Sequence, residues 1–245
     1  MTVRELWPHP SPELDVEGLV DRYPRGDRPV LRVNFVASID GAVTLDGFSA
    51  GLSGPGDKLI FGTLRMVCDA LVVAAGTIRT EKYDALRLDA DRRAWRRAHG
   101  LAEYPLMVIV SRSLDLDPDQ EIFSDAPIRP LVVTHAGAPA ERRAAIGRVA
   151  EIITAGDDEV DLGAAVVELR ARGALHLLSE GGPHLLGALA AADLVDEMCL
   201  TVSPLLVGGG AGRIAAGLPS TPRSMSLRHV LAEDDMLFLR YARTS

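Results

Sequence analysis

The chain has 245 residues, of which 47% are hydrophobic and 24% are charged, and its formal net charge at pH 7 is −8. These values argue against a disordered chain or a fibrous repeat, and the acidic balance argues against a general nucleic-acid binder. The chain has no uninterrupted apolar stretch of about 18 residues and no apolar signal-peptide core near its N-terminus. We therefore expect a cytoplasmic protein without a membrane span.

The predicted elements alternate between strands and helices. A proline-rich arm over residues 1–28, with a short helix within 12–23, is expected to precede one domain over 29–245. Apolar runs predict strands at 30–37, 70–75, 106–110, 131–134, 174–178 and 195–202, with two more within 225–242. Helices are predicted at 57–67, 139–149, 160–172 and 183–192, with a charged helix between 76 and 97. This order predicts an α/β fold: a mostly parallel central sheet, helices on both faces, and an antiparallel C-terminal edge.

The cysteines and histidines form no recognisable metal motif. Cys68 and Cys199 lie inside apolar runs and are expected to be reduced thiols in the core. A CxxC motif is absent and the 6 histidines are scattered, so no metal is expected. The segment Gly51–Lys58 resembles a P-loop, but Leu59 stands where serine or threonine would hold magnesium.

The most informative local pattern is LLSEGGPHLLGA over Leu177–Ala188. A strand ends at Glu180, two glycines follow, and Pro183 opens a helix. Glycine lets the backbone approach a ligand closely, and the start of a helix attracts anions such as a diphosphate. A plain strand-to-helix turn would show the same glycines and proline, but a carboxylate at this position is unusual for a core residue.

Two other predicted strands run into side chains that can hold phosphate. Thr77 and Arg79 follow the strand at 70–75, and Ser111 and Arg112 follow the strand at 106–110. Ligands of open α/β sheets bind at the carboxyl ends of strands. Arg112 offers bidentate contacts that would suit the 2′-phosphate of NADPH. Taken alone, each segment is equally consistent with a polar turn.

Taken in order, the segments resemble one known family. The motifs are A-S-I-D-G at 37–41, Arg65, D-A to G-T over 69–77, Ser111, E-G-G-P at 180–183, L-V-D-E at 194–197 and P-L-L-V-G-G-G at 204–210. Over about 29–241 the chain resembles the pyrimidine reductase domain of bacterial riboflavin biosynthesis, which is related in fold to dihydrofolate reductase.

The resemblance implies that NADPH reduces a ribosylamino group to a ribitylamino group, with hydride passing to ribose C1′. Substrate phosphate is then expected at Arg65 and Arg87, and the pyrimidine at Glu180. Asp40 is the candidate catalytic acid, with a purely structural turn as the alternative. Further substrate contacts are expected at Asn34 and Ser49. The expected cofactor contacts are Val36, Thr77, Glu81, Ser111, Arg112, Gly181, Gly182, Pro183, His184, Leu185 and Leu186.

Two departures from the family pattern bear on the substrate. Asn34 replaces a usual lysine, and Gly51 stands where tryptophan is frequent. The first hypothesis is reduction of 5-amino-6-(5-phosphoribosylamino)uracil. A reductase acting on another heterocycle such as dihydrofolate, and a non-catalytic NADPH-binding protein, are the alternatives. The H-x-E and P-C-x-x-C motifs of a fused zinc deaminase are absent, which predicts a stand-alone reductase. The resemblance also implies a homodimer.

Overall fold

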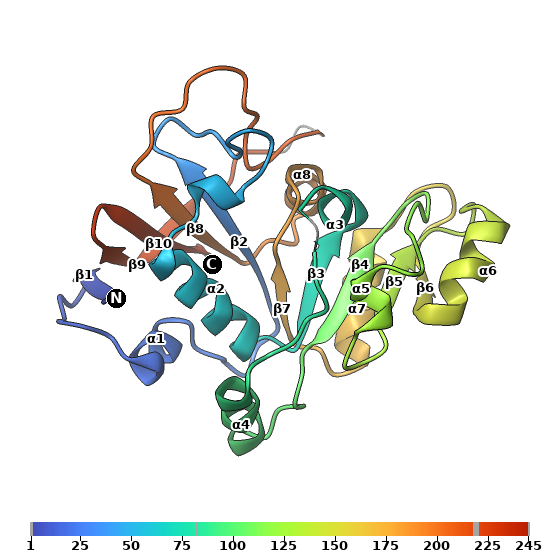
Figure 1. Ribbon diagram of the computed structural model, residues 1–245, viewed down its shortest axis with the longest axis horizontal. Coiled ribbons are helices and arrows are strands. Elements are labelled where there is room, and N and C mark those ends of the chain that lie inside the picture. Colours follow the sequence, from blue (N-terminus) through green and yellow to red (C-terminus); the bar gives the residue numbers. More distant parts are fainter. Residues whose placement is uncertain (1, 82, 218–220, 245) are drawn as a thin grey trace. The chain divides into compact units, whose positions relative to one another are not determined.

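The structure is a computed structural model that describes residues 2–81, 83–217 and 221–244. The chain divides into two compact units (Figure 1). Unit 1 comprises Met1–Val67 and Ser179–Ser245, and unit 2 comprises Cys68–Leu178.

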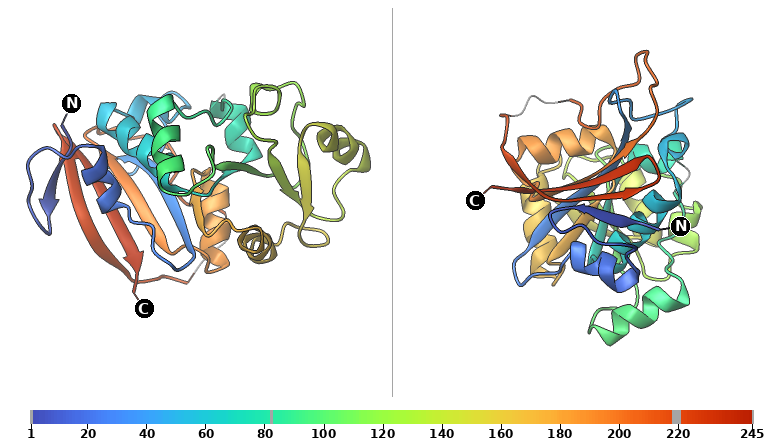
Figure 2. Two further views of the ribbon diagram at one scale, coloured as in Figure 1. Left: turned by 90° about the horizontal axis from the view of Figure 1, so that it is seen from below. Right: turned by 90° about the vertical axis from the view of Figure 1, so that its left-hand side faces the viewer.

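Unit 2 is built on parallel strands. The order is β7-β3-β4-β5-β6, and β3/β4, β4/β5 and β5/β6 all pair in parallel. The strands are β3 (Ala70–Ala74), β4 (Leu106–Val110), β5 (Leu131–Thr134), β6 (Glu151–Thr154) and β7 (His176–Ser179). The helices are α3 (Ala75–Glu81), α4 (Ala90–Ala98), α5 (Glu121–Ser124), α6 (Ala140–Val149) and α7 (Leu162–Ala171). Helices α3 and α7 lie on opposite faces of these strands (Figures 1 and 2). Covered faces explain why β3 and β5 are continuous apolar runs.

Unit 1 combines a parallel pair with antiparallel edge strands. The order is β1-β9-β10-β8-β2. Strands β2 and β8 are parallel, whereas β8/β10, β10/β9 and β9/β1 are antiparallel. The strands are β1 (Arg4–Trp7), β2 (Val30–Ser38), β8 (Glu197–Ser203), β9 (Met225–Glu233) and β10 (Met236–Arg243). The helices are α1 (Val16–Arg22), the 3-10 helix η1 (Ala50–Leu52), α2 (Pro55–Val67) and α8 (Pro183–Ala191). Helices α2 and α8 lie on opposite faces of the strands (Figures 1 and 2).

The expected α/β class is confirmed, including the mostly parallel strands and the antiparallel C-terminal edge. Two strands were not predicted from the sequence. Strand β1 lies within the N-terminal arm and pairs with β9. Of its four residues only Glu5 is buried. Strand β6 has four residues and only Ile153 is buried. Short strands at a sheet edge carry too little apolar patterning to be found from sequence.

Among the described residues, no helix is both long and apolar enough to cross a membrane. The same residues contain no group of three or more His, Cys, Asp or Glu side chains that could hold a metal ion.

Candidate functional site

Arg65 and Glu180 form a buried ion pair in unit 1. Arg65 lies in the last turn of α2, and Glu180 directly follows β7. The guanidinium donates two hydrogen bonds, from Nε to Oε1 at 2.9 Å and from Nη2 to Oε2 at 2.7 Å. Their side chains are 14% and 2% exposed. The guanidinium carbon also lies 4.0 Å from the centre of the Phe61 ring, one helical turn earlier. This bidentate geometry fixes the plane of the Glu180 carboxylate.

Burial and a second carboxylate raise the pKa of Glu180. Loss of hydration is the main cause, the charge of Asp57 adds to it, and Arg65 opposes the rise. Asp57 lies inside the first turn of α2, because the helix begins at Pro55 and not at residue 57 as predicted. Its Oδ1 accepts from Thr201 Oγ1 at 2.6 Å and its Oδ2 from Ser53 Oγ at 2.6 Å. Asp57 therefore ties the start of α2 to β8.

The turn after Glu180 has the features that its sequence predicted. Gly181 has φ +98°, and a Cβ built on it would lie 3.0 Å from Cε1 and Cζ of Phe35. Such a position suits glycine alone. Pro183 is the first residue of α8, and Gly182 at its N-cap provides no side-chain cap. The first turn of α8 thus presents main-chain N–H groups and the positive end of a helix dipole.

Asp40 follows β2 and is engaged by hydrogen bonds. Its carboxylate accepts from the Ser38 hydroxyl, from Val207 N at 3.2 Å and from Gly208 N at 2.7 Å. These three donors lower the pKa of Asp40 to about 2. At neutral pH the group is a carboxylate without a proton to give. The geometry therefore matches the structural turn and disfavours the expected role as catalytic acid.

In unit 2 the expected cofactor residues lie at the carboxyl ends of two paired strands. Thr77 and Glu81 belong to α3, which directly follows β3. Ser111 and Arg112 directly follow β4, and β3 and β4 are parallel neighbours. Ser111 is 3% exposed, and its hydroxyl has no hydrogen-bond partner among the residues that the structure describes. Arg112 is 71% exposed, and its nearest acidic atom, Glu159 Oε1, is 3.5 Å away.

Arg87 forms a different contact from the one expected. It is exposed in unit 2 and donates from Nε and Nη2 to the carboxylate of Asp125 at 2.7 and 2.6 Å. Arg87 and Asp125 therefore form a bidentate ion pair, as Arg65 and Glu180 do.

The expected site residues divide between the two units. In unit 1, Asn34 and Val36 lie on β2, and Ser49 precedes η1. The unit 1 set is Asn34, Val36, Asp40, Ser49, Arg65, Glu180, Gly181, Gly182, Pro183, His184, Leu185 and Leu186. The unit 2 set is Thr77, Glu81, Arg87, Ser111 and Arg112. Sequence reasoning missed Phe61 and Asp57, which shape the surroundings of Arg65 and Glu180.

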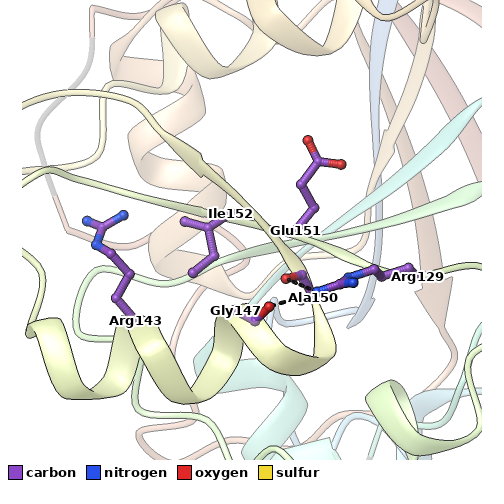
Figure 3. A pocket seen from close by; sticks show the side chains of 6 residues that line it. All are labelled: Arg129, Arg143, Gly147, Ala150, Glu151 and Ile152. Carbon is purple, nitrogen blue, oxygen red and sulfur yellow. Dashed lines mark hydrogen bonds between the residues drawn. The ribbon is translucent and has the colours of Figure 1, made fainter.

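A cavity of about 530 Å³ opens beside α6 and β6, and none of the expected site residues lines it. Both of its arginines donate hydrogen bonds to the main chain, and Figure 3 shows those of Arg129. Arg129 Nη2 donates to the carbonyls of Gly147 and Ala150 at 2.7 and 3.2 Å. Arg143 Nη2 donates to the carbonyl of His135 at 2.6 Å. Because both guanidinium groups already donate to main-chain carbonyls, we do not propose a binding site in this cavity.

Residues 29–237 match the family model described as the RibD C-terminal domain. The chain belongs to this family. It is 31% identical over 183 residues to the 2,5-diamino-6-ribosylamino-4(3H)-pyrimidinone 5′-phosphate reductase of Archaeoglobus fulgidus, covering 74% of this chain and 83% of the relative. The reductase of the same name from Methanothermobacter thermautotrophicus is 29% identical, with 76% and 82% covered.

A solved structure supports the same grouping. A pyrimidine reductase-like protein from Corynebacterium diphtheriae matches with a TM-score of 0.81 and 27% identity, covering 89% of this chain and 92% of that one. The Saccharomyces cerevisiae riboflavin biosynthesis reductase, at 14% identity and a TM-score of 0.67, shares the fold. The resemblance found from the sequence motifs is thus confirmed, and a reductase of this family requires a nicotinamide cofactor.

The residues present fit such a cofactor. Ser111 has a buried hydroxyl that no group in the described part of the chain satisfies, and buried polar atoms without partners are rare. The start of α8 is uncapped by any side chain, and the glycines before it leave room for close approach by a diphosphate. A bound nicotinamide nucleotide would supply the hydride. These residues would bind and orient it.

Proposed function

We propose that the protein is an NADPH-dependent reductase of a phosphoribosylamino-pyrimidine in riboflavin biosynthesis. The observation that carries the proposal is the Arg65–Glu180 pair, whose buried carboxylate directly precedes the uncapped start of α8. Kinship with reductases named for such a substrate supports it. In the reaction the C1′–O4′ bond of the ribosyl ring breaks. Hydride forms the new C1′–H bond, and a proton goes to O4′.

Four of the expected residues have a task in this scheme: Glu180, Arg65, Arg87 and Arg112. The oxygens of Glu180 accept hydrogen bonds from N–H groups of the pyrimidine while Arg65 holds the carboxylate in place. Arg87 suits the substrate phosphate if it exchanges Asp125 for it, and both side chains are half exposed, at 52% and 58%. Arg112 suits the 2′-phosphate that separates NADPH from NADH.

Two substrates deserve direct comparison, because they differ only at ring position 2. The first is 5-amino-6-(5-phosphoribosylamino)uracil, which has a carbonyl there. The second is the diaminopyrimidinone for which the archaeal relatives are named, which has an amino group there. A carboxylate pairs well with two adjacent N–H donors, and both substrates present such a pair to Glu180.

The test is to follow the absorbance of NADPH with each substrate and with dihydrofolate as control. Oxidation with either aminopyrimidine, and none with dihydrofolate, is expected. Tight NADPH binding without oxidation by any substrate would favour a binding protein. Oxidation with dihydrofolate alone would overturn the proposed substrate class. Replacing NADPH by NADH should lower the rate, and equal rates would refute the role given to Arg112.

We infer a homodimer formed through one face of the unit 1 sheet. Residues of β8 alternate between buried and half-buried, with Met198, Leu200 and Val202 on the half-buried face. Their partners Tyr241, Leu239 and Leu237 on β10 are half-buried as well. A contiguous apolar face of this kind favours a partner, and a second copy is the simplest one. Leu239→Lys should give a monomer in sedimentation, whereas a wild-type monomer would refute the inference.

A cytoplasmic location completes the proposal. Both cysteines are buried, and Cys199 is a free thiol. A buried free thiol is typical of proteins from a reducing compartment. Microscopy of the tagged full-length protein would check the location.

A further inference from the structure

The expected catalytic acid, Asp40, lies where two loops leave the unit 1 sheet. Strands β2 and β8 are parallel, and their last residues Ser38 and Ser203 are paired. The turn after β2 and the loop over residues 204–217, here called the glycine-rich loop, therefore start at the same edge. Both rise from the sheet side by side in Figures 1 and 2.

Hydrogen bonds join the turn to the glycine-rich loop along its first half. Ile39 N donates to the carbonyl of Leu205 at 3.1 Å, and Val43 N to that of Ala211 at 3.4 Å. Between them, Asp40 accepts from Val207 N at 3.2 Å and from Gly208 N at 2.7 Å. Among these four contacts, those of Asp40 are the ones made by a side chain, and both of its carboxylate oxygens accept from the loop.

The far half of the loop packs on the start of α8. Ala216 N donates to the carbonyl of Pro183 at 3.0 Å. A Cβ on Gly187 would lie 2.0 Å from Ala216 O, and one on Gly217 would lie 3.2 Å from Nδ1 of His184. These contacts leave no space between the loop and the first two turns of α8, so a shift of the loop must move or loosen the helix start.

We propose that Asp40 is a positioning residue, which fixes the glycine-rich loop and through it the first turn of α8. This rests on the proposed function in one respect, because α8 is taken to bind the cofactor diphosphate. The low pKa of Asp40 supports a permanent anion that anchors N–H groups. The residue then acts on cofactor affinity and carries no proton in the reaction.

The experiment compares the full-length wild type with Asp40→Asn and Asp40→Ala. Asp46→Asn is the matched control, because Asp46 is exposed on the same loop and has positive φ, which asparagine tolerates. Hydrogen exchange of the protein without cofactor is followed by mass spectrometry over 204–212 and 183–187. Faster exchange is expected in both segments for both Asp40 variants and in neither for Asp46→Asn.

Cofactor binding is the second measurement, by quenching of protein fluorescence with NADPH. We expect the Kd to rise roughly tenfold in Asp40→Ala and less in Asp40→Asn, which retains one acceptor oxygen. At saturating NADPH, kcat and its pH profile should match the wild type. A loss of kcat with an altered pH profile and unchanged Kd would overturn the proposal in favour of an acid role. Faster exchange in 204–212 without any change in 183–187 would also overturn it.

The two measurements separate this inference from the proposed function. If the wild type binds no NADPH, the proposed function fails, while exchange in the protein alone still tests whether Asp40 couples the loop to α8. If exchange rises throughout β2 and β8 as well, Asp40 serves only general stability and the inference is wrong.

Discussion

The buried pair of Arg65 and Glu180 allows a prediction whose size and pH dependence both follow from the structure. Arg65→Met keeps the length of the side chain and removes its charge. The Glu180 carboxylate, 2% exposed, then loses both guanidinium hydrogen bonds, at 2.9 and 2.7 Å. Breaking a buried pair by removing one partner costs about 3–5 kcal/mol, because an uncompensated charge remains. We expect the free energy of unfolding of unit 1 to fall by that amount near neutral pH.

The sign of the pH dependence is fixed by the raised pKa of Glu180. Burial already raises it in the wild type against the pull of Arg65. Without Arg65 the folded-state pKa rises further above its unfolded value. A raised carboxyl pKa leaves stability intact below the unfolded pKa and removes it as pH climbs through the folded pKa. The deficit of Arg65→Met should therefore be largest near pH 8 and shrink toward pH 5, by about 1.4 kcal/mol for each unit of additional pKa shift.

The assay is urea unfolding read by fluorescence. In a Trp95→Phe background, Trp7 on β1 reports on unit 1, since the chain has 2 tryptophans. Arg223→Met is the surface control within unit 1, because Arg223 is 38% exposed and its ion pair with Asp193 should contribute less than about 1 kcal/mol. The double variant Arg65→Met with Glu180→Met should recover most of the loss. A deficit that is independent of pH, or is not recovered in the double variant, would refute a buried charge as the cause.

Three other outcomes follow from the packing. Gly187→Ala should destabilise the fold by about 1–3 kcal/mol, because its Cβ would lie 2.0 Å from Ala216 O. The matched control is Gly147→Ala, whose Cβ would lie 3.8 Å from Ile152 Cδ1, so this variant should be neutral or stabilising. Thermal melting of both variants distinguishes the effect of packing from that of helix propensity. Ser111→Ala should leave stability unchanged but weaken NADPH binding by about 1 kcal/mol, with Ser113→Ala as control; unchanged titration curves would argue against cofactor contact. Cys199, whose pKa burial raises to about 12, and buried Cys68 should both resist dithiodipyridine until urea unfolds the chain, and rapid native labelling would contradict their burial.

The sequence was most informative where neighbouring residues determine the structure. The turn over Glu180, Gly181 and Gly182 was predicted together with the proline that starts α8, because strand end, positive φ and helix start are all local preferences. Ser111 was placed correctly after β4 for the same reason. Whether the turn binds a ligand depends on segments distant in the sequence, so its role in binding stays a prediction.

Contacts between distant segments were the part that sequence reasoning missed. Arg65 lies 115 positions before Glu180, and Arg87 lies 38 positions before Asp125. Separations this long do not correspond to neighbouring positions on one helix or strand, so the sequence pattern could not predict either ion pair. Such pairs form only once the parallel order of strands has brought the segments together. The phosphate roles assigned to both arginines assumed free cations, whereas the structure gives each a carboxylate.

Asp40 and Glu180 show how the surroundings of a carboxylate decide its use. Both follow strands at the same kind of sheet edge, yet N–H and O–H donors hold the pKa of Asp40 near its low value of about 2, while burial raises that of Glu180. A permanently ionised, exposed group can anchor main-chain N–H groups but cannot deliver a proton at neutral pH. A buried carboxylate clamped by an arginine can orient a ligand's N–H groups with little freedom of its own. Acceleration of the proposed hydride transfer then rests chiefly on alignment of cofactor and substrate, since neither carboxylate is set up as a strong acid.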